Sequence, residues 1–105
     1  MRRGEVWWAE LPQPIGRRPV VLLSRDAAYS VRTSATVGIV TRTIRNIPVE
    51  VSLEQADGMP VKCVVNLDDI LTIPKSRLTE RITTLSPEKL TAVAKAVVFA
   101  LDLKL

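Results

Sequence analysis

The chain has 105 residues, of which 47% are hydrophobic and 25% charged, and its net charge is +4. This length favours one small domain, 1–105, and the longest uninterrupted apolar run, 96–101, is far too short to cross a membrane. The absence of histidine excludes a histidine general base, and the single cysteine, Cys63, excludes an internal disulfide. A lone cysteine fits a reducing compartment, so we expect a cytoplasmic protein.

The positive charge is concentrated in the N-terminal part of the chain. Residues 1–45 hold eight arginines against three acidic side chains, whereas residues 46–105 hold seven basic and eight acidic side chains. Arginine binds phosphate groups through two parallel hydrogen bonds and stays charged when it is partly buried. The distribution favours a polyanionic partner such as nucleic acid, with an ordinary arginine-rich surface as the alternative.

The hydrophobic pattern predicts a mostly β chain with one terminal helix. Short segments rich in Val, Ile, Leu and Thr predict strands over residues 5–11, 19–24, 36–42, 48–53, 61–66, 70–73 and 81–84. A turn is expected at 57–60 and a single helical turn at 74–78. Ser86 followed by Pro87 predicts a capped helix start, and apolar residues then recur at helical spacing. We expect an α+β protein, in which a small, strongly bent sheet or barrel is capped by the helix.

The segment 17–24, Arg-Arg-Pro-Val-Val-Leu-Leu-Ser, is the most informative part of the chain. Pro19 restricts the backbone of Arg18 to extended conformations at the entrance of a predicted strand. Thr41 stands at the exit of the strand that follows. A guanidinium and a hydroxyl near each other suit a phosphate group, although a solvated arginine and an ordinary strand-end threonine would look the same.

The residues around these two positions are further candidates. Thr43 can also donate to a phosphate, and Arg42 between the threonines is expected on the opposite face if the strand persists. Asp68 and Asp69 follow an apolar run, where they form either a solvated turn or a site that accepts a proton from a ribose 2′-hydroxyl. Asn66 can contact a base edge or satisfy a turn. Because no other ligand cluster is apparent, we expect no metal site.

The aromatic residues and the cysteine have simpler interpretations. Trp7, Trp8 and Tyr29 could stack on nucleobases. Adjacent residues of a strand face opposite ways, so one tryptophan is expected in the core and the other at the surface or at an interface. Cys63, in a predicted strand, is expected to be a small buried apolar residue.

Taken in order, these segments resemble the MazF/PemK (Kid) family of toxin endoribonucleases. The similarity covers nearly the whole chain and rests on residues 3–7, 18–24, 40–41, 64–73 and 77–85, followed by the terminal helix. It implies a homodimer of SH3-like barrels that cleaves single-stranded RNA at a short motif, without a metal or another cofactor. The implied products are 2′,3′-cyclic phosphate and 5′-hydroxyl ends. The implied protein partner is an antitoxin with a flexible acidic tail that binds the same groove.

The resemblance also implies roles for individual residues. The catalytic residues would be Arg18, Thr41 and Asp68, and the residues that contact RNA would be Arg17, Arg42, Thr43, Asn66 and Asp69. Asn66 stands where one branch has an RNA-contacting arginine, and Asp69 replaces a common glutamine. The loop 12–17 is shorter than in many members and lacks their Gly-x-Glu stretch.

Two other functions are compatible with the same fold. One is a toxin like the CcdB branch, which poisons DNA gyrase without cutting RNA, and the other is an RNA-binding module without catalytic activity. Retention of Arg18, Thr41 and an acid at position 68 favours the ribonuclease, because a gyrase poison does not need that set.

Overall fold

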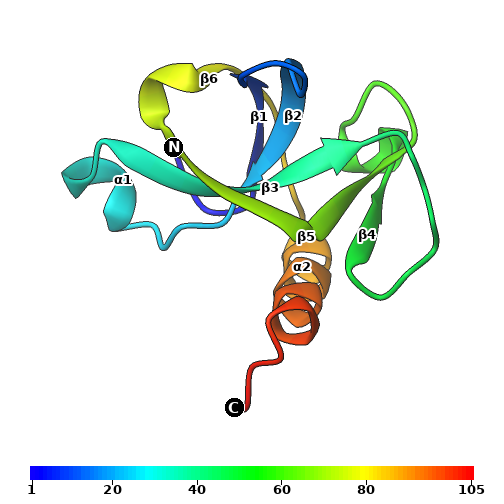
Figure 1. Ribbon diagram of the computed structural model, residues 1–105. Coiled ribbons are helices and arrows are strands. Elements are labelled where there is room, and N and C mark those ends of the chain that lie inside the picture. The colour runs from blue at the N-terminus through cyan, green and yellow to red at the C-terminus, as the bar shows by residue number, and fades with distance from the viewer.

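The computed structural model describes residues 1–105 and forms one curled antiparallel sheet of six strands (Figure 1). The elements are β1 (Glu5–Glu10), β2 (Arg17–Leu22), α1 (Ala28–Val31), β3 (Ser34–Thr41), β4 (Glu50–Leu53), β5 (Cys63–Pro74), β6 (Leu78–Thr84) and α2 (Pro87–Ala100). Two single 3₁₀ turns, η1 (Gln55–Asp57) and η2 (Lys75–Arg77), interrupt them. The strand order is β4-β5-β3-β2-β1-β6. The predicted α+β class, with mainly antiparallel strands and a C-terminal helix, is confirmed.

The largest difference from the predicted elements is in β5. Two strands were expected, over 61–66 and 70–73, but residues 63–74 form one strand with an irregularity in the middle. Gly38 of β3 pairs with Ile70, whereas the next residue, Ile39, pairs with Asn66, so residues 67–69 bulge out of the pairing. A Cβ atom on Gly38 would lie only 3.1 Å from Cδ1 of Leu67, so the glycine leaves room for the bulged segment.

Other boundaries differ by a few residues. Helix α1 was not predicted, because four residues are too few to show helical periodicity. Strand β6 begins at Leu78 rather than at residue 81. It directly follows η2, which is the helical turn expected at 74–78. The turn expected at 57–60 is present, with Gly58 in the left-handed region at φ 92°.

Each face of the sheet carries its own hydrophobic cluster. Val21 belongs to the cluster that includes Val93 of α2, and its neighbour Val20 belongs to the cluster around Tyr29. Because side chains alternate along a strand, the two tryptophans of β1 also face opposite ways. Trp7 packs against the Tyr29 cluster, and both indoles remain partly exposed.

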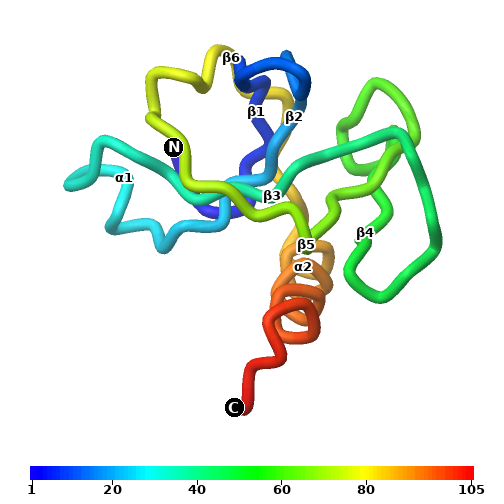
Figure 2. The backbone as a smooth tube through the Cα atoms, in the orientation of Figure 1, coloured from blue at the N-terminus to red at the C-terminus, as the bar shows by residue number.

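Helix α2 extends away from the curled sheet and ends close to the C-terminus (Figure 2). It packs against β4 and β5. Neither helix has the length and the apolar character that crossing a membrane requires. The connection between β3 and β4 swings wide of the sheet before it returns (Figure 2), and this excursion begins directly after Thr41.

Replacing Ser86 with alanine should destabilise the protein by about 1 kcal/mol. The Ser86 hydroxyl accepts a hydrogen bond from the backbone N–H of Lys89 at 3.1 Å, and it satisfies one of the unpaired donors at the start of α2. Urea unfolding of Ser86→Ala measures the loss. Ser76→Ala, which removes an exposed serine that caps no helix, should change the free energy of unfolding by less than about 0.5 kcal/mol.

The protein should lose part of its stability in acid through Glu5. Burial raises the pKa of this carboxyl, but the Trp7 indole, which donates to it at 2.9 Å, a backbone hydrogen bond and the charge of Arg81 outweigh burial and lower the pKa below its ordinary 4.5. A carboxyl with a lowered pKa stabilises the fold above its unfolded pKa, and this contribution disappears as pH falls through the folded value.

The check is urea unfolding of the wild type and Glu5→Gln from neutral pH to below the ordinary pKa of the carboxyl. The variant should be less stable at neutral pH by an amount on the order of 1 kcal/mol, and the two stabilities should converge in acid. A difference that stays constant with pH would contradict the assignment.

Candidate functional site

The start of β2 and the end of β3 bring Arg18 and Thr41 together. Val20 pairs with Ile39 in the antiparallel register of these strands. Continuing this register for two residues places Arg18 opposite Thr41. Pro19 restricts Arg18 to an extended backbone, and β3 ends at Thr41 itself. The guanidinium and the hydroxyl therefore lie on the same rim of the sheet.

Two hollows adjoin this rim and share Arg18, Thr41 and Thr43. The first has a volume of about 650 Å³, and we call it the arginine hollow; its lining includes Trp8, Arg17, Arg18, Arg42, Met59 and Val61. The second has a volume of about 500 Å³, and we call it the aspartate hollow; its lining includes Arg18, Arg45, Asn66, Asp68, Asp69 and Ile70. All eight residues predicted from the sequence line one hollow or both.

Arg18 is held by the short loop that precedes β2. Its Nε donates a hydrogen bond to the carbonyl oxygen of Ile15 at 3.4 Å, and the side chain is partly buried. None of the ion pairs in the chain joins a carboxylate to Arg18. The remaining N–H groups of the guanidinium are therefore available to an anion at the rim.

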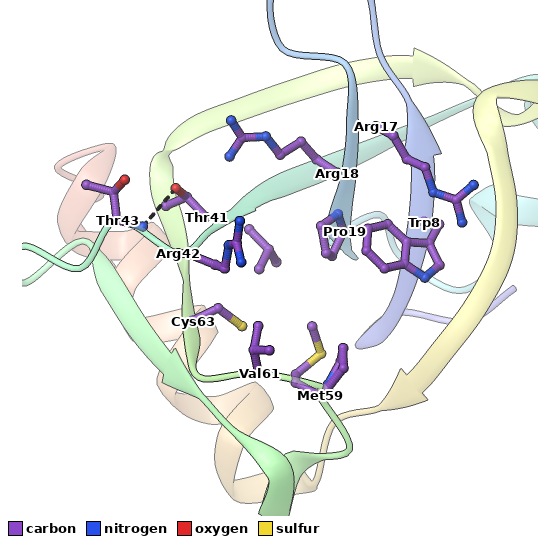
Figure 3. A pocket seen from close by; sticks show the side chains of 12 residues that line it. Trp8, Arg17, Arg18, Pro19, Thr41, Arg42, Thr43, Met59, Val61 and Cys63 are labelled. Carbon is purple, nitrogen blue, oxygen red and sulfur yellow. Dashed lines mark hydrogen bonds between the residues drawn. The ribbon is translucent and has the colours of Figure 1, made fainter.

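Thr41, the last residue of β3, lines the arginine hollow together with Arg42 and Thr43, which follow it (Figure 3). The hydroxyl of Thr41 accepts a hydrogen bond from the backbone N–H of Thr43 at 3.1 Å, which leaves its own hydrogen free to donate. The expectation that Arg42 faces away from the two threonines holds only if the strand continues. Since β3 stops at Thr41, Arg42 lines the same hollow as its neighbours.

The arginine hollow has a strongly positive lining. Arg17, Arg18 and Arg42 line it, and no acidic side chain does. The guanidinium carbon of Arg17 lies 4.7 Å from the centroid of the Trp8 ring, within the range of a cation–π contact. The Glu10 carboxylate, which does not line the hollow, forms an ion pair with Arg17 at 3.3 Å.

The aspartate hollow contains the bulge of β5. Asp68 and Asp69 are exposed there, whereas Asn66 is buried, with 4% of its surface accessible. The Oδ1 atom of Asn66 accepts a hydrogen bond from the backbone N–H of Asp68 at 2.9 Å. Of the two roles considered for Asn66, the structure shows the satisfaction of a turn.

Sequence reasoning considered Trp8 for stacking on nucleobases but did not place it beside Arg18, and it missed Arg45 as a lining residue. Arg45 reaches the aspartate hollow from the connection between β3 and β4. The Glu50 carboxylate fixes this connection by accepting hydrogen bonds from the backbone N–H groups of Arg45 and Asn46, at 2.9 and 3.0 Å. The only signal in the sequence was another arginine two positions after Thr43.

No group of three or more Cys, Asp or Glu side chains lies close enough together to hold a metal ion, and histidine is absent. Cys63 is buried at the floor of the arginine hollow, with 2% of its surface accessible. Burial, reinforced by the charge of Asp57, raises the pKa of its thiol. The thiol is therefore protonated at neutral pH, as expected for a small buried apolar residue.

The chain is similar to known toxins over almost its whole length. Residues 2–101 match the family model of the PemK-like, MazF-like toxin of type II toxin-antitoxin system. The probable endoribonuclease MazF5 of Mycobacterium tuberculosis is 43% identical over 101 residues, which cover 95% of this chain and 92% of that protein.

Solved structures show the same fold. The Mycobacterium tuberculosis toxin MazF-mt6 superposes with a TM-score of 0.88 at 31% identity, covering 96% of this chain and 99% of that one. A mycobacterial endoribonuclease in complex with its cognate antitoxin also gives 0.88, at 25% identity, covering 100% and 98%. The chain belongs to the PemK/MazF family of toxins of type II toxin–antitoxin systems.

Proposed function

We propose that this chain cleaves single-stranded RNA at a short sequence motif, without a metal ion, by attack of a ribose 2′-hydroxyl on the adjacent phosphate. The products are a 2′,3′-cyclic phosphate and a 5′-hydroxyl end. Family membership makes the chain an endoribonuclease toxin, and the chemistry is the proposed part. The observation that carries it is the position of Arg18 and Thr41 on a rim between a hollow lined by three arginines and one that carries two aspartates.

The scissile phosphate lies on this rim. Arg18 and Thr41 donate hydrogen bonds to its oxygens, and the guanidinium stabilises the extra negative charge of the transition state. Asp68 accepts the proton of the 2′-hydroxyl, which enters from the aspartate hollow. The leaving 5′-oxygen takes a proton from Arg18 or from solvent. With an arginine rather than a histidine in this position, catalysis depends chiefly on positioning and on charge stabilisation.

The remaining predicted residues position the RNA on either side of the cut. Arg17, Arg42 and Thr43 contact it in the arginine hollow. Asn66 supports the bulge, and Asp69 lies beside the path of the strand, where its negative charge disfavours a close phosphate. The arginine hollow therefore carries most of the phosphate contacts, which makes RNA binding weaken as salt concentration rises.

We further propose that 1–105 is one toxin domain that acts in the cytoplasm as a homodimer and is neutralised by an antitoxin with a flexible acidic tail. Phe99 and Leu101 at the end of α2 are 60% and 56% exposed, which supports a partner surface at this end of the chain. The arginines on the rim suit an acidic tail for the same reason that they suit RNA. One solved structure that resembles this chain is described as a complex with its cognate antitoxin.

The experiment that tests the proposal is incubation of the purified protein with a long single-stranded RNA in the presence of EDTA, followed by mapping of the ends. Discrete cuts with 5′-hydroxyl ends are expected. Cuts that EDTA abolishes would contradict metal independence, and 5′-phosphate ends would contradict attack by the 2′-hydroxyl. Intact RNA from a folded preparation would refute cleavage and favour the gyrase-poison alternative, which an assay of gyrase inhibition then tests.

A further inference from the structure

The arginine hollow is larger than a single phosphate group. Its lining away from the rim of Arg18 and Thr41 is aromatic and aliphatic. Trp8 forms one side of it, and Arg18, Thr41 and Arg42 lie across from the indole (Figure 3). Met59 and Val61 line a further side (Figure 3). A volume of about 650 Å³ lies in the range of small-ligand pockets. The hollow thus combines a cationic end with an aromatic and aliphatic end.

The indole of Trp8 is fixed in its place at the surface. Trp8 pairs with Pro19 and Glu10 pairs with Arg17 across β1 and β2, so these four side chains lie on one face of the sheet. Arg17 lies over the Trp8 ring and is itself held by Glu10 at 3.3 Å. A flat ring fixed in this way loses little conformational freedom when another ring stacks on it.

The aliphatic side is also built rather than incidental. It follows Gly58, whose left-handed backbone turns the chain from η1 towards the hollow. Met59 is 3% exposed and belongs to the core, so it anchors the segment from below. A third hollow of about 450 Å³, whose lining includes Trp8, Met59, Pro60 and Arg81, adjoins the arginine hollow at the indole.

The charges in the hollow specify the kind of ligand. A ligand that fits should be flat at one end and anionic at the other. The hollow offers the Trp8 indole, with Arg17 against it, on one side and the guanidinium groups of Arg18 and Arg42 on the opposite side (Figure 3). A nucleotide of single-stranded RNA has both properties, since its base stacks on aromatic rings and its phosphate binds arginine. No carboxylate lines the hollow to repel the phosphate.

We propose that the arginine hollow is a nucleobase subsite, in which the base next to the scissile phosphate stacks on Trp8 and is enclosed by the segment 59–61. This inference rests on the proposed function, because the base that reaches the hollow is identified by its position next to the scissile phosphate at Arg18 and Thr41. Arg17 and Glu10 act as positioning residues for the indole. Trp8 contributes substrate binding and takes no part in the proton transfers.

The first test measures the contact between Trp8 and the RNA through fluorescence, and it does not depend on cleavage. Trp7→Phe leaves Trp8 as the only tryptophan, so its fluorescence reports the hollow alone. Titration with 2′-O-methylated RNA hexamers of mixed sequence, which lack the attacking hydroxyl, should quench this fluorescence to saturation. The matched control is Trp8→Phe, which retains only Trp7 and should show little quenching. Circular dichroism establishes that both variants are folded.

Three results of this titration would overturn the inference. The first is RNA binding, measured by anisotropy of a labelled hexamer, that leaves Trp8 fluorescence unchanged. The second is equal quenching in the Trp8→Phe control. The third is quenching of Trp8 by a polyglutamate peptide as strong as that by RNA, since this would show that the hollow responds to anions without a base.

The second test uses the mapped RNA and compares Trp8→Leu with Trp8→Phe. Loss of stacking should lower kcat/KM of the leucine variant by about 5- to 150-fold through a higher KM, while kcat changes little. Phenylalanine, which still stacks, should recover most of the loss. A merely structural role would instead reduce the fraction of folded protein, so thermal unfolding of each variant is measured alongside. Unchanged KM in folded Trp8→Leu would overturn the inference.

The two tests separate this inference from the proposed function. Quenching of Trp8 by RNA from a protein that cleaves nothing would support the subsite and refute the cleavage chemistry. Cleavage that depends on Arg18 but is indifferent to Trp8 would support the chemistry and refute the subsite.

Discussion

Arg18→Ala should lower the rate of RNA cleavage by about 100- to 1,000-fold or more, while the protein stays folded. Removal of a single preorganised donor to a developing negative charge has an effect of this size in other enzymes, and Arg18 stands opposite Thr41 when the register of β2 and β3 is continued. Its one hydrogen bond within the chain, to the carbonyl of Ile15, is long at 3.4 Å, so its loss costs little stability. Single-turnover cleavage of a mapped RNA measures the rate.

Two further variants make this result specific. Arg18→Lys keeps the positive charge but loses the planar fork, so it should retain more activity than alanine and less than the wild type. Arg77→Ala removes an exposed arginine from η2, which lies outside both hollows, and should cleave at nearly the wild-type rate. Cleavage at the wild-type rate by folded Arg18→Ala would refute the assignment of this residue.

The positions of Arg18 and Thr41 could be predicted because each is tied to a local signal in the sequence. Pro19 marks the start of one strand, and the apolar run before Thr41 marks the end of the next. Consecutive strands of an antiparallel sheet commonly pair, so the two residues meet with no long-range information. The terminal helix was predicted for a similar reason, since Ser86 and Pro87 are local start signals.

The bulge that carries Asp68 and Asp69 could not be predicted in the same way. Two charged residues after an apolar run have the pattern of a strand end, and the sequence was divided there into two strands. The structure continues β5 through them, because Gly38 on the neighbouring strand leaves space that Leu67 occupies. Gly38 lies about 30 residues before the bulge in the chain, and the hydrophobic pattern of a single segment contains no information about such a distant residue.

The side of the site formed by Trp8 could be predicted only in part, for a related reason. The sequence indicated that one tryptophan of β1 faces outward, but nothing local connects Trp8 with Met59 or with Arg42. These residues meet only when the sheet curls and η1 turns the chain back towards β2. Sequence reasoning therefore located the rim of Arg18 and Thr41 and offered Trp8 for base stacking, but it did not show that these residues line one hollow.

Gly58→Ala should destabilise the protein by about 2–6 kcal/mol. Gly58 has a φ of 92°, a conformation that residues with a side chain rarely adopt. A Cβ atom there would overlap with the hydroxyl oxygen of Thr83 and lie 2.7 Å from its Cβ. That hydroxyl donates to the carbonyl of Asp57 at 3.0 Å, so the clash also disturbs the bond that joins η1 to β6. Urea unfolding measures the loss.

Gly16→Ala separates strain from overlap. Gly16 also has a positive φ, of 70°, but a Cβ atom there would meet only the flexible amide of Gln13, at 3.4 Å. Gly16→Ala should lower the free energy of unfolding by about 1–2 kcal/mol, which corresponds to the strain of the left-handed backbone alone. Equal losses in the two variants would contradict this explanation, because they would show that Thr83 moves aside without a cost in stability. Because Met59 to Val61 follow Gly58 directly, folded Gly58→Ala should also bind RNA more weakly, whereas Gly16→Ala leaves that side of the arginine hollow intact.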